Sequence, residues 1–283
     1  MGNVNVTIRN CTASEMPLIQ QLSLIDSRNP GQNDSDLFFR VDSNGFFIAV
    51  NDTNVVGSIS AVSYDAGFGF IGLHFVMPEF QNTEVEEKLL EVALQKLGER
   101  NIGLNCYESQ LNYYTGHGFK PSHKIFTYEG IADGQMPSLD TIVAPFNHPF
   151  NLLQELDEEC FPYNRKELLQ LWLQQSGSML LAKLVNGKYE GYGLFSPATN
   201  NYKISPLVCK NLEAAEHLLS ALAGHLEKGT HYRIDLPENN KNAIRLVEKM
   251  KMTKVQETIR LYLKNEPNIS LQNVYSFINH ELG

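Results

Sequence analysis

The feature that most constrains this chain is the repetition of one order of secondary-structure elements in its two halves. Residues 4–130 are predicted to form helices, a hairpin, a strand, a helix, a strand, a short helix and a closing strand. Residues 151–264 repeat that order, and Asn186-Gly187 supplies a typical two-residue turn for the second hairpin. The repetition predicts a mixed α/β fold with two tandem domains, residues 1–130 and 151–283, joined by a linker of residues 131–150.

Composition excludes several classes of function. The 283 residues suit two domains, and the net charge of −9 argues against a nucleic-acid partner. We expect no membrane span, because no apolar run approaches the roughly 20 residues that one needs. The cysteines are far apart and form no CxxC pair, so we expect no metal site and a reducing, cytoplasmic location; they are Cys11, Cys106, Cys160 and Cys209.

One stretch has the layout of a phosphate-binding turn. A predicted strand, Gly72 to Met77, is followed by PEFQNTEVEEKLLEVALQKL, a polar turn that continues into an amphipathic helix. The N-terminus of such a helix offers backbone N–H groups to an anion. The turn contains no glycine, however, and it carries Glu84 and Glu86. In the alternative interpretation these carboxylates only stabilise the start of the helix, and nothing is bound there.

Several motifs resemble those of the GNAT (GCN5-related N-acetyltransferase) superfamily. In the first half these are VVGSISAVSY, VMPEFQNTEVEEKLLEVAL and YYTGHGFKP, and in the second half NNKNAIRLVEKMKM is a looser match. The whole chain resembles a tandem-domain GNAT subgroup through NPG, GFF, Phe161-Pro162, Arg165, GYG, YKISPL and ETIRLY. The resemblance implies two GNAT-like acyl-CoA N-acyltransferase domains, with acetyl-CoA as co-substrate and no metal.

The resemblance also implies the site residues of the first half. Tyr114 takes the position of a tyrosine that protonates the leaving thiolate. The cofactor-binding residues would be Phe75, Val76, Met77, Gln81, Asn82, Thr83, Glu84, Val85 and Glu86. Glu84 and Glu86 replace two glycines of the family motif. One carboxylate about 5 Å from a phosphate costs about 3 kcal/mol at an effective dielectric constant of about 20, which is roughly a hundredfold in affinity.

The acceptor is expected to be an amine, either a small molecule or a peptide. Asn29, Asp34 and His74 are candidates for contacting it, although loop polarity and a structural role for a strand histidine explain them as well. The second half lacks the tyrosine, which is replaced by Val247, and lacks glycines in its turn. We interpret it as a scaffold, or as a wall of the acceptor site of the first half.

Two functions remain open at this point. The first is an N-acyltransferase whose active site lies in the N-terminal domain. The alternative is a catalytically inactive GNAT-like protein that binds a small molecule or a protein partner; use of another acyl donor or a shifted CoA position is a third interpretation. A homodimer is compatible with the sequence, which does not determine the oligomeric state.

Overall fold

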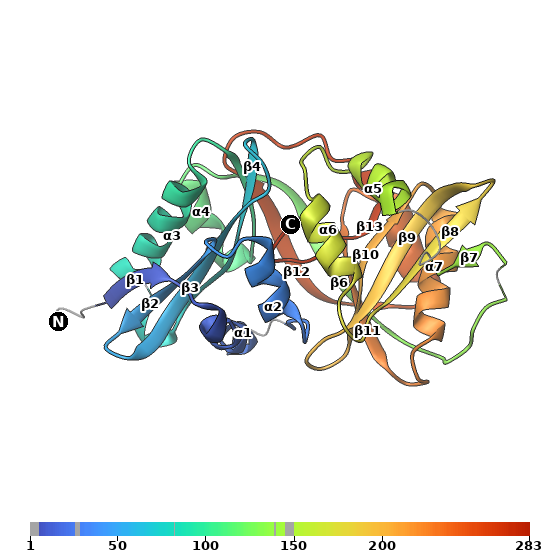
Figure 1. The fold of residues 1–283 in the computed structure, drawn as a ribbon, viewed down its shortest axis with the longest axis horizontal. Helices are drawn as coiled ribbons and strands as arrows, with labels where there is room; N and C mark the ends of the chain where they lie inside the picture. The colour runs from blue at the N-terminus through green and yellow to red at the C-terminus, as the bar shows by residue number, and fades with distance from the viewer. Residues whose placement is uncertain (1–5, 26–28, 82, 139, 145–149) are drawn as a thin grey trace.

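The computed structural model describes residues 6–25, 29–81, 83–138, 140–144 and 150–283. Figure 1 shows two lobes side by side, the first coloured blue to green and the second yellow to orange. The C-terminus lies between the lobes, and the N-terminus lies at the far end of the first. Both lobes are mixed α/β structures, as the element order predicts.

The first half follows the predicted order of elements. Thr12 and Glu15 form a capping box before α1, and Thr83 caps α3 by accepting a hydrogen bond from the backbone N–H of Val85 at 3.3 Å. Gly98 ends α3 with a φ of 58°, which glycine adopts without strain. The elements are β1 (Val6–Asn10), α1 (Met16–Ile25), α2 (Asp34–Val41), β2 (Phe46–Asn51), β3 (Asn54–Ser63), β4 (Phe68–Val76), α3 (Glu84–Leu97), β5 (Asn101–Cys106), α4 (Leu111–Gly116) and β6 (Lys120–Ile131).

The second half repeats that order and adds a terminal strand. Asn186 and Gly187 have φ values of 50° and 76°, so they form the predicted hairpin turn. The elements are β7 (Ile142–Val143), α5 (Phe150–Glu158), α6 (Lys166–Leu173), β8 (Met179–Val185), β9 (Lys188–Pro197), β10 (Tyr202–Cys209), α7 (Leu212–Gly224), β11 (His231–Pro237), α8 (Lys241–Lys249), β12 (Thr253–Tyr262) and β13 (Val274–Ser276). The short strand β7 lies within the segment predicted as a linker, and β13 was not predicted.

The two halves exchange strands. The described strands form one sheet in the order β1-β2-β3-β4-β5-β12-β6-β11-β10-β9-β8-β7, and β13 pairs with β10 outside this path. Strand β12 of the second half therefore lies between β5 and β6 of the first half, and β6 pairs with β11 of the second half. In Figure 1, β12 (red) crosses into the space between the lobes. Each half thus supplies a strand that continues the sheet of the other.

Helices cover the sheet and enclose three cores. Helix α3 packs on β2 to β4 in the first half, and α7 packs on β8 to β10 in the second. The third core joins the halves, because Phe38 of α2 stacks on Trp172 of α6 with ring centroids 6.3 Å apart. The relative position of the halves is therefore fixed both by strands and by buried aromatic packing.

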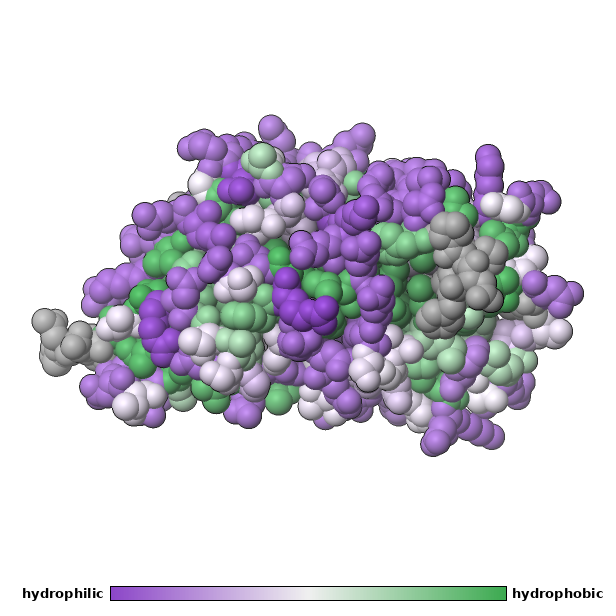
Figure 2. All heavy atoms as spheres, in the orientation of Figure 1, coloured by the Kyte–Doolittle hydropathy of each residue, from purple (hydrophilic) through white to green (hydrophobic). Residues whose placement is uncertain are grey.

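The face shown in Figure 2 is covered mainly by hydrophilic side chains, with apolar side chains showing between them. Among the described helices, none is both long enough and apolar enough to cross a membrane.

Candidate active site

Strands β4 and β5 separate part-way along their length. They pair in parallel from Phe68 and Asn101 to Ile71 and Leu104, and the pairing stops there. At the same level β4 contains a bulge, because Ser58 pairs with Phe75 while Ser60 pairs with Gly72. Leu73, within the bulge, has a φ of 47°. This conformation is uncommon for a leucine and marks a backbone that the surrounding structure holds in place.

A cleft, called here the splay cleft, lies between the separated strand ends. Residues from β4, the turn before α3, α3 itself and the segment after β5 line it: His74, Phe75, Val76, Gln81, Glu86, Tyr107, Ser109 and Gln110. The Gln81 side chain donates a hydrogen bond of 3.2 Å to the carbonyl of Val76 at the end of β4. The N-terminus of α3 therefore lies beside the cleft, with Gln81 and Glu86 on that side.

The glutamates at the start of α3 point in different directions. Glu84 pairs with Lys88 at 3.0 Å, and 71% of its side chain is exposed to solvent. Glu87 accepts a hydrogen bond from His117 at 2.8 Å. Glu86 is half-buried and lines the splay cleft. Of the two glutamates that take the glycine positions of the family motif, only Glu86 is therefore among the described residues that line the cleft.

Tyr114 is linked to the cleft by a histidine. Its hydroxyl lies 2.8 Å from Nδ1 of His74, and both residues are buried. His74 lines the splay cleft, whereas the described lining does not include Tyr114. Tyr113 packs edge-on against Tyr114 with ring centroids 5.1 Å apart. The His74 imidazole therefore connects the Tyr114 hydroxyl to the cleft and can carry a proton between them.

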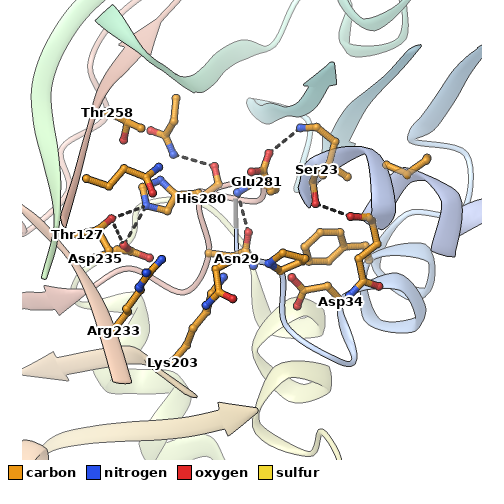
Figure 3. A pocket seen from close by; sticks show the side chains of 18 of the residues that line it. Ser23, Asn29, Asp34, Thr127, Lys203, Arg233, Asp235, Thr258, His280 and Glu281 are labelled. Carbon is orange, nitrogen blue, oxygen red and sulfur yellow. Dashed lines mark hydrogen bonds and ion pairs between the residues drawn. The ribbon is translucent and has the colours of Figure 1, made fainter. Parts of the chain in front are cut away.

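A second cavity, the central cavity, lies between the two halves (Figure 3). It has about 830 Å³ of empty space, including the part that opens to solvent. Apolar side chains of α1 and α2 form one wall, and polar side chains of the second half form another; they include Met16, Ile19, Phe38, Lys203, Arg233 and Asp235. Tyr107 lines both this cavity and the splay cleft. The two spaces therefore share a lining residue, Tyr107, which follows the end of β5.

The carboxylates of the central cavity have different environments. Burial raises the pKa of Asp34, although Lys203 and the Gly31 backbone N–H, 2.8 Å from its carboxylate, oppose that shift. Burial also acts to raise the pKa of Asp235, but the neighbouring His280 and Thr127 lower it to about 2. Asp235 lies 3.0 Å from Nε2 of His280 and 2.6 Å from the Thr127 hydroxyl. It is therefore an ionised group that is already paired.

The C-terminal residues complete this cavity. Asn279, His280 and Glu281 line it, and the Glu281 carboxylate accepts a hydrogen bond of 2.7 Å from the backbone N–H of Leu73. The Asn105 side chain donates to the His280 carbonyl at 2.8 Å. The tail lies so close to β4 that a Cβ added to Gly72 would be 2.2 Å from the Glu281 carbonyl oxygen. The bulge of β4 is therefore covered by the end of the chain.

The corresponding gap in the second half is filled by protein. Strands β10 and β11 pair at only two positions, Tyr202 with Tyr232 and Lys203 with Arg233. Beyond them β13 pairs with β10, and its residues Val274, Tyr275 and Ser276 are fully buried. The position that is open between β4 and β5 in the first half is therefore occupied by β13 in the second half.

Models of the acetyltransferase (GNAT) domain match two parts of the chain, residues 37–138 and residues 153–276. The chain is a tandem GNAT protein. The predicted fold, a mixed α/β structure with two GNAT-like domains, is thereby confirmed.

Several known proteins are similar to this chain over nearly their whole length. The tandem GNAT chain is 22% identical to holothin acyltransferase of Pseudoalteromonas sp. (strain SANK 73390), over 98% of this chain and 94% of that protein. It is 23% identical to an uncharacterised N-acetyltransferase of Bacillus subtilis (strain 168), over 90% of each. A putative acetyltransferase from Pyrococcus horikoshii superposes with a TM-score of 0.85 at 21% identity, covering 100% of this chain and 98% of that one. A tandem GNAT protein from the clavulanic acid biosynthesis pathway gives a TM-score of 0.66 at 12% identity, covering 93% and 100%.

The predicted site residues of the tandem GNAT chain fall into three groups. Phe75, Val76, Gln81 and Glu86 are brought together around the splay cleft, and His74 joins them there rather than in the central cavity. Met77, Thr83, Glu84, Val85 and Tyr114 lie near it but are not among its described lining. Asn29 and Asp34 line the central cavity. Asn82 lies outside the described residues.

Other lining residues were not identified from the sequence. Tyr107, Ser109 and Gln110 follow β5, and their only local signal was a position after a predicted strand. Lys203, Arg233 and Asp235 belong to the second half. Lys203 lies within the YKISPL motif, but no site role was predicted for it, and no motif marks Arg233 or Asp235. Asn279, His280 and Glu281 come from a C-terminal segment for which no role was predicted.

Proposed function

We propose that this protein is an N-acyltransferase that transfers an acetyl group from acetyl-CoA to an amine, with its active site in the first half. One observation carries the proposal: the gap between β4 and β5 forms a cleft beside the N-terminus of α3, whereas β13 fills the gap of the second half. The GNAT domain matches and the acyltransferase names of the relatives support acyl transfer as the reaction class.

The cleft offers the contacts that an acyl-CoA needs. The backbone of Phe75, Val76 and Met77 would bind the pantetheine arm along the edge of β4 that no longer pairs with β5. The backbone N–H groups near Gln81 to Glu86 would receive the pyrophosphate, because a helix N-terminus favours an anion. Glu84 does not oppose this binding, since its carboxylate faces solvent and pairs with Lys88.

The reaction can be written with the side chains of the cleft. The amine nitrogen forms a bond to the thioester carbon and loses one proton to solvent, and the carbon–sulfur bond breaks to release the thiolate of CoA. The thiolate takes a proton from the Tyr114–His74 pair, which is replenished from solvent. His74 is the member that lines the cleft, and the Tyr114 hydroxyl holds its Nδ1 at 2.8 Å.

The test is acetyl-CoA titration by calorimetry, followed by a free-thiol assay with a panel of primary amines. We expect binding, and turnover that falls about tenfold to a hundredfold in Tyr114→Phe while the KM for acetyl-CoA stays constant. His74→Gln should lower kcat at least as much. Absence of acetyl-CoA binding at millimolar concentration would refute the proposal. Unchanged kcat in both variants would show that Tyr114 and His74 do not protonate the thiolate.

A second candidate function is supported by Glu86. Glu86 lines the cleft at a position where the family motif has a glycine. A carboxylate at this position would repel a phosphate nearby. The protein would then be a catalytically inactive GNAT-like binder of a small molecule or a protein partner. Turnover of any amine by the wild-type protein would exclude this candidate.

A further inference from the structure

We propose that Glu281 is a catalytic residue that binds the ammonium group of the acceptor and takes its proton, and that the acceptor is a primary amine on an apolar body. This inference rests on the proposed function and specifies the substrate class and the base of the same site. The base could not be identified from the elements of the first half alone, because Glu281 belongs to the C-terminal tail, after β13.

Glu281 lines the central cavity beside the part of β4 that leads into the splay cleft. Its carboxylate is 2.7 Å from the backbone N–H of Leu73, which lines the central cavity. The next residue, His74, lines the splay cleft, and Tyr107 lines both spaces. A thioester that enters along β4 would therefore approach this carboxylate from one side, and an amine in the central cavity would approach it from the other.

The tail holds this carboxylate in a fixed position. Strand β13 is buried against β10 just before the tail begins, and the backbone N–H of Phe277 donates to the Asp235 carbonyl at 2.8 Å. The Asn105 side chain binds the His280 carbonyl, and Gly72 lets the Glu281 backbone approach β4 closely. The Glu281 residue is 8% exposed. Such fixation is what a general base needs, because it avoids reorganisation during the reaction.

The other carboxylates of the cavity are less suited to this role. The charge of Lys203 acts on Asp34 and opposes the rise of its pKa, so Lys203 would compete with an ammonium group for that carboxylate. Asp235 is engaged by Thr127 and His280. Two cationic residues, Lys203 and Arg233, also line the cavity on the side of the second half (Figure 3). Arg233 donates to Glu129 at 2.8 Å. Glu281 is the carboxylate that binds the Leu73 amide, one residue before His74 of the splay cleft.

The wall opposite the second half defines the body of the acceptor. Met16, Ile19, Phe38 and Leu73 present apolar side chains to the cavity. An apolar group attached to the amine would lie against them and gain about 25 cal/mol for each Å² removed from water. The cavity thus combines an apolar surface with one carboxylate near the cleft, which fits an amine with an aromatic or aliphatic substituent.

The proposed step is balanced in protons. The bound ammonium gives one proton to Glu281 and becomes a nucleophile. Its nitrogen then attacks the thioester carbon and loses a second proton as the amide forms and the carbon–sulfur bond breaks. One proton therefore leaves to solvent through Glu281, and one ends on the CoA thiol. No oxidant or reductant is required.

The test compares phenethylamine with 2-phenylethanol, which has a similar shape and no charge, as ligands of the full-length protein. We expect the wild-type protein to bind the amine about tenfold more tightly, and Glu281→Gln to remove that preference while it keeps an acceptor oxygen for the Leu73 amide. In the thiol assay with phenethylamine, Glu281→Gln should lower kcat about a hundredfold with an unchanged KM for acetyl-CoA. Glu266→Gln, a half-exposed carboxylate outside the cavity lining, is the matched control.

Two results would overturn the inference. One is equal affinity of the wild-type protein for the amine and the alcohol, and the other is a preference that persists in Glu281→Gln. Thermal melting of each variant separates these results from loss of the fold. Acetyl-CoA binding is measured in parallel, so failure of the inference with cofactor binding intact leaves the proposed function standing.

Discussion

At the scale of single residues, the direction of one carboxylate decides whether an anion can bind at α3. Glu84 and Glu86 both take positions where the family motif has glycine, and a sequence cannot distinguish their effects. In the structure Glu84 pairs with Lys88 in solvent, whereas Glu86 lines the splay cleft. Residues two apart on a helix point in different directions, so the expected repulsion applies to one of them.

Glu86→Gln should therefore strengthen acetyl-CoA binding. We expect about a tenfold lower dissociation constant, because the substitution removes the repulsion between the carboxylate and the phosphate. The effect is smaller than a hundredfold because solvent screens the charge of a half-exposed side chain. Calorimetric titration of acetyl-CoA at low salt measures the effect, and Glu84→Gln is the matched control with an expected change below twofold. Equal effects of the two substitutions would contradict the assigned side-chain directions.

His123 makes a second prediction at this scale. Burial and the charge of Arg260 lower its pKa to about 3, although the half-exposed Glu266 carboxylate lies 3.5 Å from Nδ1. The unfolded chain binds this proton near pH 6.5, so the folded state loses stability as the pH falls from about 6.5 to about 3.

As the pH falls from 6 to 4, the free energy of unfolding of the wild-type protein should decrease by about 1.4 kcal/mol for each pH unit, relative to that of His123→Gln. Urea unfolding of both proteins at several pH values measures it. A difference in unfolding free energy that stays constant over this range would show that His123 is protonated in the folded state.

At the scale of elements, the bulge of β4 and the C-terminal tail act as one unit. Gly72 leaves the space in which the Glu281 backbone lies, and the Leu73 N–H that the bulge exposes is bound by the Glu281 side chain. The position of Glu281 therefore depends on a glycine more than 200 residues earlier in the chain.

Gly72→Ala should displace the tail. A Cβ there would be 2.2 Å from the Glu281 carbonyl oxygen, so backbone must move, and we expect about 1–3 kcal/mol of destabilisation. Urea unfolding measures this change. Gly116→Ala is the control, since a Cβ added at Gly116 meets nothing within 4 Å. If both substitutions have the same small effect, the tail does not pack on β4 as described.

Elements of local origin could be predicted from the sequence, and elements that depend on distant partners could not. The Asn186-Gly187 turn and the amphipathic pattern of α3 are local signals, and each led to the correct element. Strand β13 has three residues, which is too short for a periodic pattern, and it is stabilised by β10 more than 60 residues earlier. The site residues of the tail were missed for the same reason.

At the scale of the whole molecule, the exchange of β6 and β12 makes the two halves interdependent. Both halves are copies of one unit, so each offers a similar place for a final strand, and the alternating pattern of β6 suits either sheet. Sequence patterns therefore predict the strand but not the sheet that it joins. The central cavity, formed by both halves and the tail, depends on that choice.

The exchange predicts that neither half folds alone. A fragment of residues 1–131 would lack β12 between β5 and β6, and a fragment of residues 151–283 would lack β6 beside β11. We expect one cooperative transition for the full chain in calorimetry and no cooperative transition for either fragment. A fragment with a cooperative transition of its own would show that the exchanged strands are dispensable.

The central claim is that the first half alone holds the acyl-CoA site, because β13 fills the corresponding gap of the second half. The most direct test is the stoichiometry of acetyl-CoA binding to the full-length protein, measured by calorimetry on the wild-type protein and on Glu86→Gln. The account predicts one molecule per chain in both, with tighter binding in the variant. Two molecules per chain, or binding that is indifferent to Glu86, would contradict it.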